Sequence, residues 1–115
     1  MENYEQRQER YRSEAAKEFT PEHLRDIAKL EHCARDLLAK TVAELHSAIS
    51  LKDSKRVAYL RQRRFYLLLL CDESVTRSIL RGNLNQMRRR NSLVADEVIK
   101  EVEQKAGAHF DNVLQ

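Results

Sequence analysis

Arginine and aromatic side chains alternate in one short stretch of the chain. Arg61 and Arg63 are followed closely by Phe65 and Tyr66. Guanidinium groups bind carboxylates and phosphates, while aromatic rings fill apolar pockets of a protein partner or stack on the bases of a single strand. Their combination indicates a binding surface rather than a catalytic centre.

Positive charge is concentrated around this stretch. Residues 52–90 hold 11 Lys/Arg against 3 Asp/Glu, whereas residues 1–51 carry a net charge of −2 and residues 91–115 a net charge of −3. A basic middle with acidic flanks favours an anionic partner, or an assembly in which the acidic ends dock on the basic segment. The residues predicted to bind a partner are Arg61, Arg63, Phe65, Tyr66, Leu70, Arg88, Arg89 and Arg90.

Residue patterns for catalysis or metal binding are missing from the sequence. None of the four histidines follows a glutamate by three positions, as the Glu-x-x-His pattern of di-iron bundles requires. With only 2 glycines, the chain has no glycine-rich phosphate loop and no nucleophile elbow. We therefore expect no catalytic residues, no metal and no cofactor, and a protein that is not an enzyme.

The cysteines and the apolar segments predict the cellular compartment of the protein. Cys33 and Cys71 form no Cys-x-x-Cys pattern, and the first residues lack the apolar core of a signal peptide. The longest apolar run, 65–71, is far shorter than the roughly 20 residues that span a bilayer. We expect a soluble cytoplasmic protein with two reduced thiols and no membrane contact.

Composition and periodicity predict that helices position these residues. The chain has 2 glycines and 1 proline, and 34% of its residues are charged. Thr20-Pro21-Glu22 is a helix-start pattern. Apolar residues at steps of three and four predict helices over about 21–50 and about 54–81, with a short turn near Lys52 and a stop at Gly82-Asn83.

The two helices are expected to pack as an antiparallel hairpin, because their apolar stripes match when folded at Lys52. The matched pairs are Leu45 with Leu60, Leu37 with Leu67, Ala34 with Leu70, and Leu30 with Val75. Arg64 lies in the middle of the second stripe, so either it is buried against a carboxylate, which we expect, or the stripe opens there to receive a partner. Glu44 is the first candidate partner, with Asp96 and Glu97 as others.

Two interpretations remain for the segment that follows. Residues 84–106 fit one long helix, with Asn91 as a single polar residue in a heptad-like seam. Alternatively, the helix breaks at Asn91-Ser92 and Ser92 caps a shorter helix. The segment Arg89-Arg90-Asn91-Ser92-Leu93 also matches the pattern phosphorylated by basophilic kinases, and this match matters only if the helix breaks there.

The ends of the chain are expected to be peripheral. Residues 1–19 form either a helical arm of low intrinsic stability or a disordered segment. Residues 107–115 form a tail with at most one short turn. The sequence thus predicts a single all-α domain over 1–115, a small helical bundle built on the long hairpin.

The predicted binding residues lead to two hypotheses about function. Tyr66 and Leu70 are expected to need the arm or a second chain to cover them. The leading hypothesis is a non-enzymatic protein–protein interaction module, acting as an adaptor, regulator or complex subunit and most simply as a homodimer. The alternative is a nucleic-acid-binding or regulatory protein that uses the basic segment 52–90.

Overall fold

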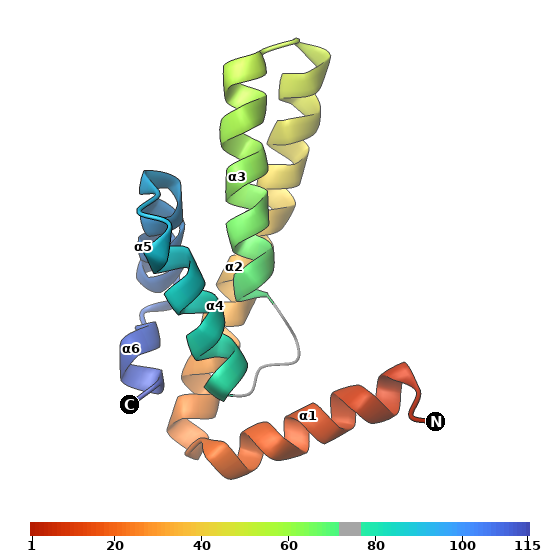
Figure 1. Cartoon of the computed structure of the whole chain (residues 1–115), viewed down its shortest axis with the longest axis vertical. Coiled ribbons are helices and arrows are strands. Elements are labelled where there is room, and N and C mark those ends of the chain that lie inside the picture. Colours follow the sequence, from red (N-terminus) through yellow and green to blue (C-terminus); the bar gives the residue numbers. More distant parts are fainter. Residues whose placement is uncertain (72–76) are drawn as a thin grey trace.

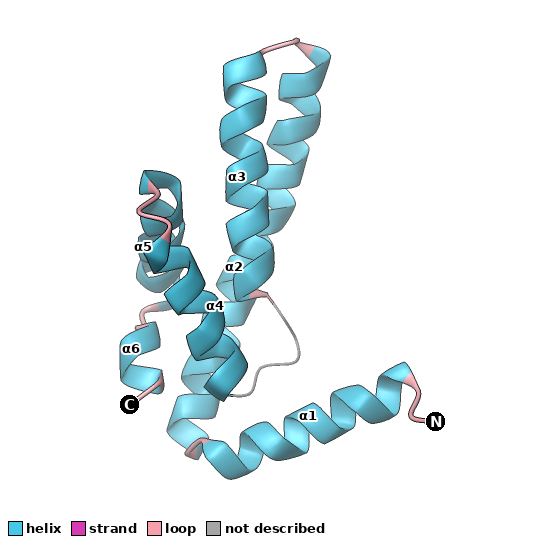
Figure 2. Ribbon diagram, viewed as in Figure 1, coloured by secondary structure: helices cyan, strands magenta, loops and turns pink. Residues whose placement is uncertain are grey.

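The computed structural model describes residues 1–71 and 77–115. Within these residues helices joined by short turns and loops make up the chain, and there is no strand, which confirms the predicted all-α bundle (Figure 2). The helices are α1 (Tyr4–Glu18), α2 (Pro21–Ser50), α3 (Ser54–Leu70), α4 (Arg77–Arg89), α5 (Leu93–Ala106) and α6 (Phe110–Val113).

The hairpin of α2 and α3 is the axis of the structure (Figure 1). The Thr20 hydroxyl accepts a hydrogen bond from the backbone N–H of His23 at 3.2 Å, so it caps α2 as predicted. Asp53 caps α3 by accepting from the backbone N–H of Arg56, also at 3.2 Å. In the turn between α2 and α3, Lys52 has a φ of 57°, a left-handed backbone conformation that allows the chain to reverse its direction.

The matched stripes of the hairpin meet as predicted. Leu45 and Leu60 share a small apolar cluster near the turn, which Ala48 completes. Leu37 and Leu67 belong to the main core, as do Ala34 and Leu70. The fourth predicted pair cannot be assessed, because Val75 lies outside the described residues.

The predicted helix over 54–81 is wrong, because α3 ends at Leu70 and residue 77 already belongs to α4. Gly82 is not a stop but lies inside α4. Leu80 and Leu84, on either side of it, are both buried, and this burial offsets the roughly 1 kcal/mol that a glycine costs inside a helix. Asn83 donates its side-chain N–H to the carbonyl of Leu69 at 3.0 Å, satisfying an open carbonyl at the end of α3.

The helix break at Asn91-Ser92 is confirmed, and the continuous heptad-like helix is wrong. Asn91 has a φ of 49°, a left-handed conformation that asparagine tolerates better than most residues. The Ser92 hydroxyl accepts a hydrogen bond from the backbone N–H of Ala95 at 3.3 Å and caps α5. As a result α5 folds back to pack on both helices of the hairpin (Figure 1).

A helix lies near each end of the chain. α1 extends sideways from the lower end of the bundle, joined to it through the buried Phe19 (Figure 1). Arg77 lies over the Phe19 ring at 4.8 Å and donates to the carbonyl of Glu18 at 2.9 Å. Arg77 also donates to the backbone oxygen of Gln115 at 2.5 Å, so one side chain ties the arm to the tail.

Candidate functional site

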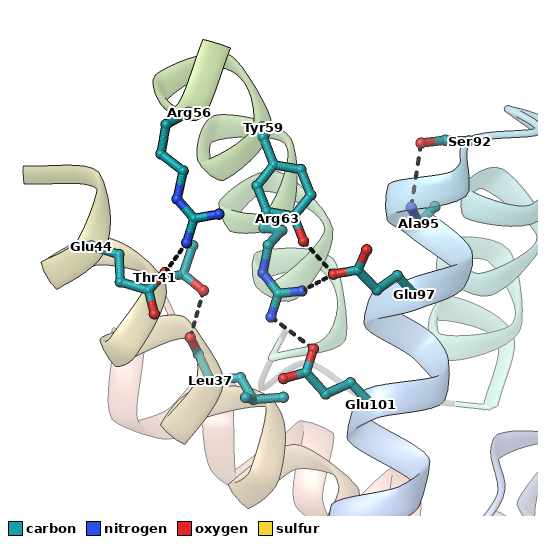
Figure 3. A network of polar contacts seen from close by, with 10 residues as sticks. All are labelled: Leu37, Thr41, Glu44, Arg56, Tyr59, Arg63, Ser92, Ala95, Glu97 and Glu101. Carbon is teal, nitrogen blue, oxygen red and sulfur yellow. Dashed lines mark hydrogen bonds and ion pairs between the residues drawn. The ribbon is translucent and has the colours of Figure 1, made fainter. Parts of the chain in front are cut away.

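A buried arginine connects α3 to α5. Arg63, only 8% exposed, donates to Glu97 at 2.7 Å and to Glu101 at 2.9 Å (Figure 3). Tyr59 donates its hydroxyl to the same oxygen of Glu97, and the Arg63 guanidinium lies 5.9 Å from the centre of the Tyr59 ring. The guanidinium fork therefore bridges two carboxylates that are one turn apart on α5.

The electrostatics of this group keep Arg63 charged. Burial, the largest single influence, lowers the pKa of Arg63, but the hydrogen bonds and charges of Glu101 and Tyr59 together raise the pKa above its ordinary value. The pKa of the Tyr59 hydroxyl is also raised, first by burial and then by its hydrogen bond to Glu97, with Arg63 opposing. Neither group is tuned towards neutral pH, where a general acid or base would work.

The prediction that Arg64 is the buried arginine is wrong. Arg64 is exposed, and Arg63 takes the core position instead. The proposed partner Glu44 pairs with Arg56 at 2.9 Å, where both side chains are about half exposed. Glu97, another predicted partner of Arg64, does form a buried ion pair, but with the neighbouring Arg63. A buried structural ion pair exists, one residue away from its expected place.

An open groove lies where α3 meets the turn between α4 and α5. Its volume is about 440 Å³. Its lining residues are Arg61, Gln62, Phe65, Tyr66, Arg90 and Ser92. We call it the Arg61–Arg90 groove. None of the described residues that line it is acidic, and it joins two guanidinium groups, an amide, two hydroxyls and two aromatic rings. These groups suit an anionic ligand group that sits beside an apolar one.

Arg61, Phe65 and Arg90 are the predicted residues that the structure brings together. The Arg90 guanidinium lies 5.0 Å from the centre of the Phe65 ring, which holds it at the groove. Within the described residues, neither Arg61 nor Arg90 forms an ion pair with a carboxylate. No carboxylate in residues 1–71 or 77–115 therefore neutralises either charge at the groove.

The other two predicted arginines of α4 point elsewhere. Arg88 is engaged by Asp111, with its two terminal nitrogens 3.0 and 3.2 Å from the two carboxylate oxygens. Arg89 is exposed and lines a second hollow of about 340 Å³, which it shares with Arg90. The three consecutive arginines thus diverge around the helix, and only Arg90 reaches the groove.

The expectation that Tyr66 and Leu70 need the arm or a second chain for cover is wrong. In the single chain their exposed fractions are 5% and 3%. The Phe65 ring packs on Tyr66 edge to face, with centroids 5.5 Å apart, and α4 contacts α3. Tyr66, Leu70 and Arg63 are therefore buried and offer little area to a partner.

Sequence reasoning missed two contributors to this surface. Leu68 is 51% exposed and lies one turn after Phe65, which is 41% exposed. Leu93 is 85% exposed and directly follows Ser92 at the groove. The spacing of Arg61, Phe65 and Leu68 along one helix face was the available signal. We use the name docking face for the Arg61–Arg90 groove together with Leu68 and Leu93.

A further groove lies beside Arg63, lined by residues of α2, α3 and α5. It has a volume of about 410 Å³, and its acids Glu44, Glu97 and Glu101 are already bound to arginines of the same chain. In the parts of the chain that the structure describes, no group of three or more His, Cys, Asp or Glu side chains is placed to hold a metal ion. Likewise, no described helix is long and apolar enough to cross a membrane.

Cys33 and Cys71 are half-buried free thiols, and burial of Cys71 leads to a prediction about its reactivity. Burial raises the pKa of Cys71 from an ordinary value of 9.0 to about 11, with Arg35 opposing. Only the thiolate attacks iodoacetamide, so Cys71 should react roughly a hundredfold more slowly at pH 8 than a cysteine in a short peptide.

The rate at Cys71, followed by peptide mass spectrometry, should rise about tenfold per pH unit until pH approaches about 11. The folded protein must be intact across this range, which circular dichroism at each pH establishes. A rate that stops rising near pH 9 would show that Cys71 is not shielded as the structure has it.

Comparison with known proteins gives no match for this chain among family models, curated proteins or solved structures.

Proposed function

We propose that this chain is a non-enzymatic protein–protein interaction module that acts through the docking face. The observation that carries the proposal is the Arg61–Arg90 groove, where two arginines that pair with no carboxylate among the described residues flank the half-exposed Phe65. Arginine and aromatic residues are enriched at the energetic centres of protein interfaces. The partner expected here presents a carboxylate beside an apolar side chain.

A second copy of the chain is the first partner to test. Residues 1–51 carry a net charge of −2 and residues 52–90 a net charge of +8, so a second copy can present carboxylates of its first 51 residues to the basic groove. By contrast, Glu97, Glu101 and Asp111 are already paired within the chain. Exposed leucines on the same face supply apolar area that water disfavours. A symmetric dimer would bury such a patch on both copies at once.

Substituting Leu68→Glu is expected to abolish association without unfolding the chain. Leu68 is 51% exposed, so the free energy of unfolding should change by no more than about 0.5 kcal/mol. A carboxylate in the apolar part of an interface is desolvated on binding, so it should prevent docking. Solution mass by light scattering, at low and at high salt, measures the effect: a wild-type dimer at both salts and a Leu68→Glu monomer.

Leu51→Glu is the matched control. Leu51 is 80% exposed in the turn between α2 and α3, at the far end of the hairpin from the docking face (Figure 1). This variant should remain a dimer. A wild-type monomer at both salts would exclude the homodimer, and a Leu68→Glu variant that still dimerises would move the interface away from this face.

Nucleic-acid binding is the second candidate function, and one observation favours it. Arg61, Arg64, Arg89 and Arg90 are all exposed, and the ring of Phe65 is 41% exposed for stacking. The ratio of absorbance at 260 and 280 nm, recorded on the same light-scattering peak, separates the two candidates. Absorbance at 260 nm that is present at low salt, shed at high salt and lost in Arg89→Glu/Arg90→Glu would favour nucleic acid.

A further inference from the structure

We infer that Ser92 is a phosphorylation site for an arginine-directed protein kinase, and that Arg61 and Arg90 receive the phosphate in the Arg61–Arg90 groove. Three independent observations support the inference: the sequence around Ser92, the conformation of its turn, and the charges that surround the hydroxyl. The phosphorylation itself does not depend on the proposed function. Only its consequence for partner binding rests on that proposal.

The sequence presents the residues that such a kinase reads. Two adjacent arginines precede Ser92 by three and two positions, and the apolar Leu93 follows it. Arg89 and Arg90 are exposed, and Leu93 is 85% exposed. All three side chains are therefore free of the core and can enter a kinase cleft without disturbing the packing.

The turn that carries Ser92 is weakly held. The backbone N–H of Arg90 donates to Met87 at 3.4 Å, and that of Asn91 donates to Arg88 at 3.3 Å. The capping bond from Ala95 to the Ser92 hydroxyl is 3.3 Å long (Figure 3). These three bonds are at the long end of the range for N–H···O bonds, and the segment before the α5 bond from the Asp96 N–H to the Ser92 carbonyl, 3.1 Å long, lies outside regular helix. A serine inside a regular helix would not be presented in this way.

The groove supplies charge to hold the product. Ser92 lines the same groove as Arg61 and Arg90, and no carboxylate of the described chain pairs with either arginine. The stacking of Arg90 on Phe65 limits the positions of its guanidinium. A phosphate on Ser92 adds a charge of roughly −1.5 to −2 at pH 7 and three acceptor oxygens, which arginines bind by charge-assisted hydrogen bonds.

The reaction is a phosphoryl transfer from ATP, catalysed by the kinase. The Oγ atom of Ser92 attacks the γ-phosphorus, a new O–P bond forms, and the bond between the γ-phosphorus and the bridging β–γ oxygen breaks. ADP leaves with that oxygen, and the hydroxyl proton passes to the kinase base. If the docking face binds an acidic partner as proposed, the phosphate then occupies the groove in its place.

Phosphorylation of the full chain tests the inference directly. The probe is the catalytic subunit of cyclic-AMP-dependent protein kinase with magnesium and ATP, followed by intact mass and peptide mapping. We expect one phosphate, located on Ser92, and none in a Ser92→Ala variant. Ser13 is an internal control, because it also follows arginines but lies within α1. Absence of phosphate, or phosphate only at another residue, would overturn the site.

The arginine assignment has its own test. Phosphorylation should raise the melting temperature by roughly 5 °C, and a ³¹P titration should place the phosphate pKa below its usual value of roughly 6. Both effects should shrink in Arg61→Ala, although Arg61 lies far from the kinase motif in sequence and should leave the phosphorylation rate unchanged. Arg64→Ala is the matched control, since Arg64 is exposed on the same helix but does not line the groove.

The outcomes separate the two receivers of the phosphate. The N-terminus of α5 also attracts a phosphate through its backbone dipole, and Arg61→Ala leaves that contribution in place. Shifts that are undiminished in Arg61→Ala, or that fall equally in Arg64→Ala, would show that the groove does not receive the phosphate. Shifts that fall in Arg61→Ala alone would support the assignment.

Discussion

Replacing Phe110 by alanine is expected to lower the free energy of unfolding by about 3–5 kcal/mol. The Phe110 ring is 2% exposed, and α6 places it in the main core cluster with residues from α2 to α5. Its removal leaves a cavity that surrounding helices can fill only in part, because they are fixed by their own packing. Since small domains are stable by about 5–15 kcal/mol, this single change should remove a large share of the total.

The size of this effect can be checked by urea denaturation followed by circular dichroism. Phe65→Ala is the matched control, because Phe65 is 41% exposed and should cost about 1 kcal/mol or less. Equal costs for the two variants would mean that the tail does not pack on the core. If the free energy of unfolding of Phe110→Ala depends less steeply on urea concentration than that of the wild type, the transition is no longer cooperative. The expected loss of free energy would then not apply.

The tail also shows where sequence reasoning loses information. Phe110 and Val113 are visible in the sequence, but a helix as short as α6 has almost no periodicity to detect. Its position follows from distant contacts: Arg81 donates to the carbonyl of Leu114 at 2.7 Å, and Glu103 accepts from the backbone N–H of Phe110 at 2.9 Å. Such contacts form only after the bundle has brought these segments together.

The hairpin could be predicted because local and long-range signals agree. Thr20 and Asp53 mark the starts of α2 and α3, and the apolar stripes of the two helices match along their length. The end of α3 could not be predicted in the same way. Gly82 was the strongest stop signal, yet Leu80 and Leu84 carry the buried stripe of α4 through it.

The periodic pattern of apolar residues could not decide whether Arg63 or Arg64 is buried. Both lie three or four residues from Leu60 and from Leu67, so either fits the stripe of α3. Glu97 and Glu101 on α5 decide the matter, since they face Arg63. The groove was only partly predictable for a related reason: Arg61 and Phe65 share a helix face, but Arg90 and Ser92 join them only because the chain turns at Asn91.

Removing both acids that bind Arg63 should be the most damaging polar change in the bundle. In Glu97→Ala/Glu101→Ala, Arg63, which is 8% exposed in the intact chain, loses both carboxylates that bind its guanidinium, and we expect the free energy of unfolding to fall by about 3–5 kcal/mol. In Arg63→Met, the two glutamates keep side chains that are 48% and 37% exposed and remain hydrated, so the loss should be only about 1–2 kcal/mol.

The difference in the free energy of unfolding between these two variants tests whether Arg63 carries a buried charge. Arg63→Met should rescue the double variant, since the triple variant no longer contains an unpaired guanidinium. The Arg56–Glu44 pair is the control: its side chains are 49% and 53% exposed, so removing either residue should cost no more than about 1 kcal/mol. If urea melts show that Arg63→Met costs as much as losing both glutamates, with no rescue in the triple variant, then packing of the arginine stem rather than its charge joins α3 to α5.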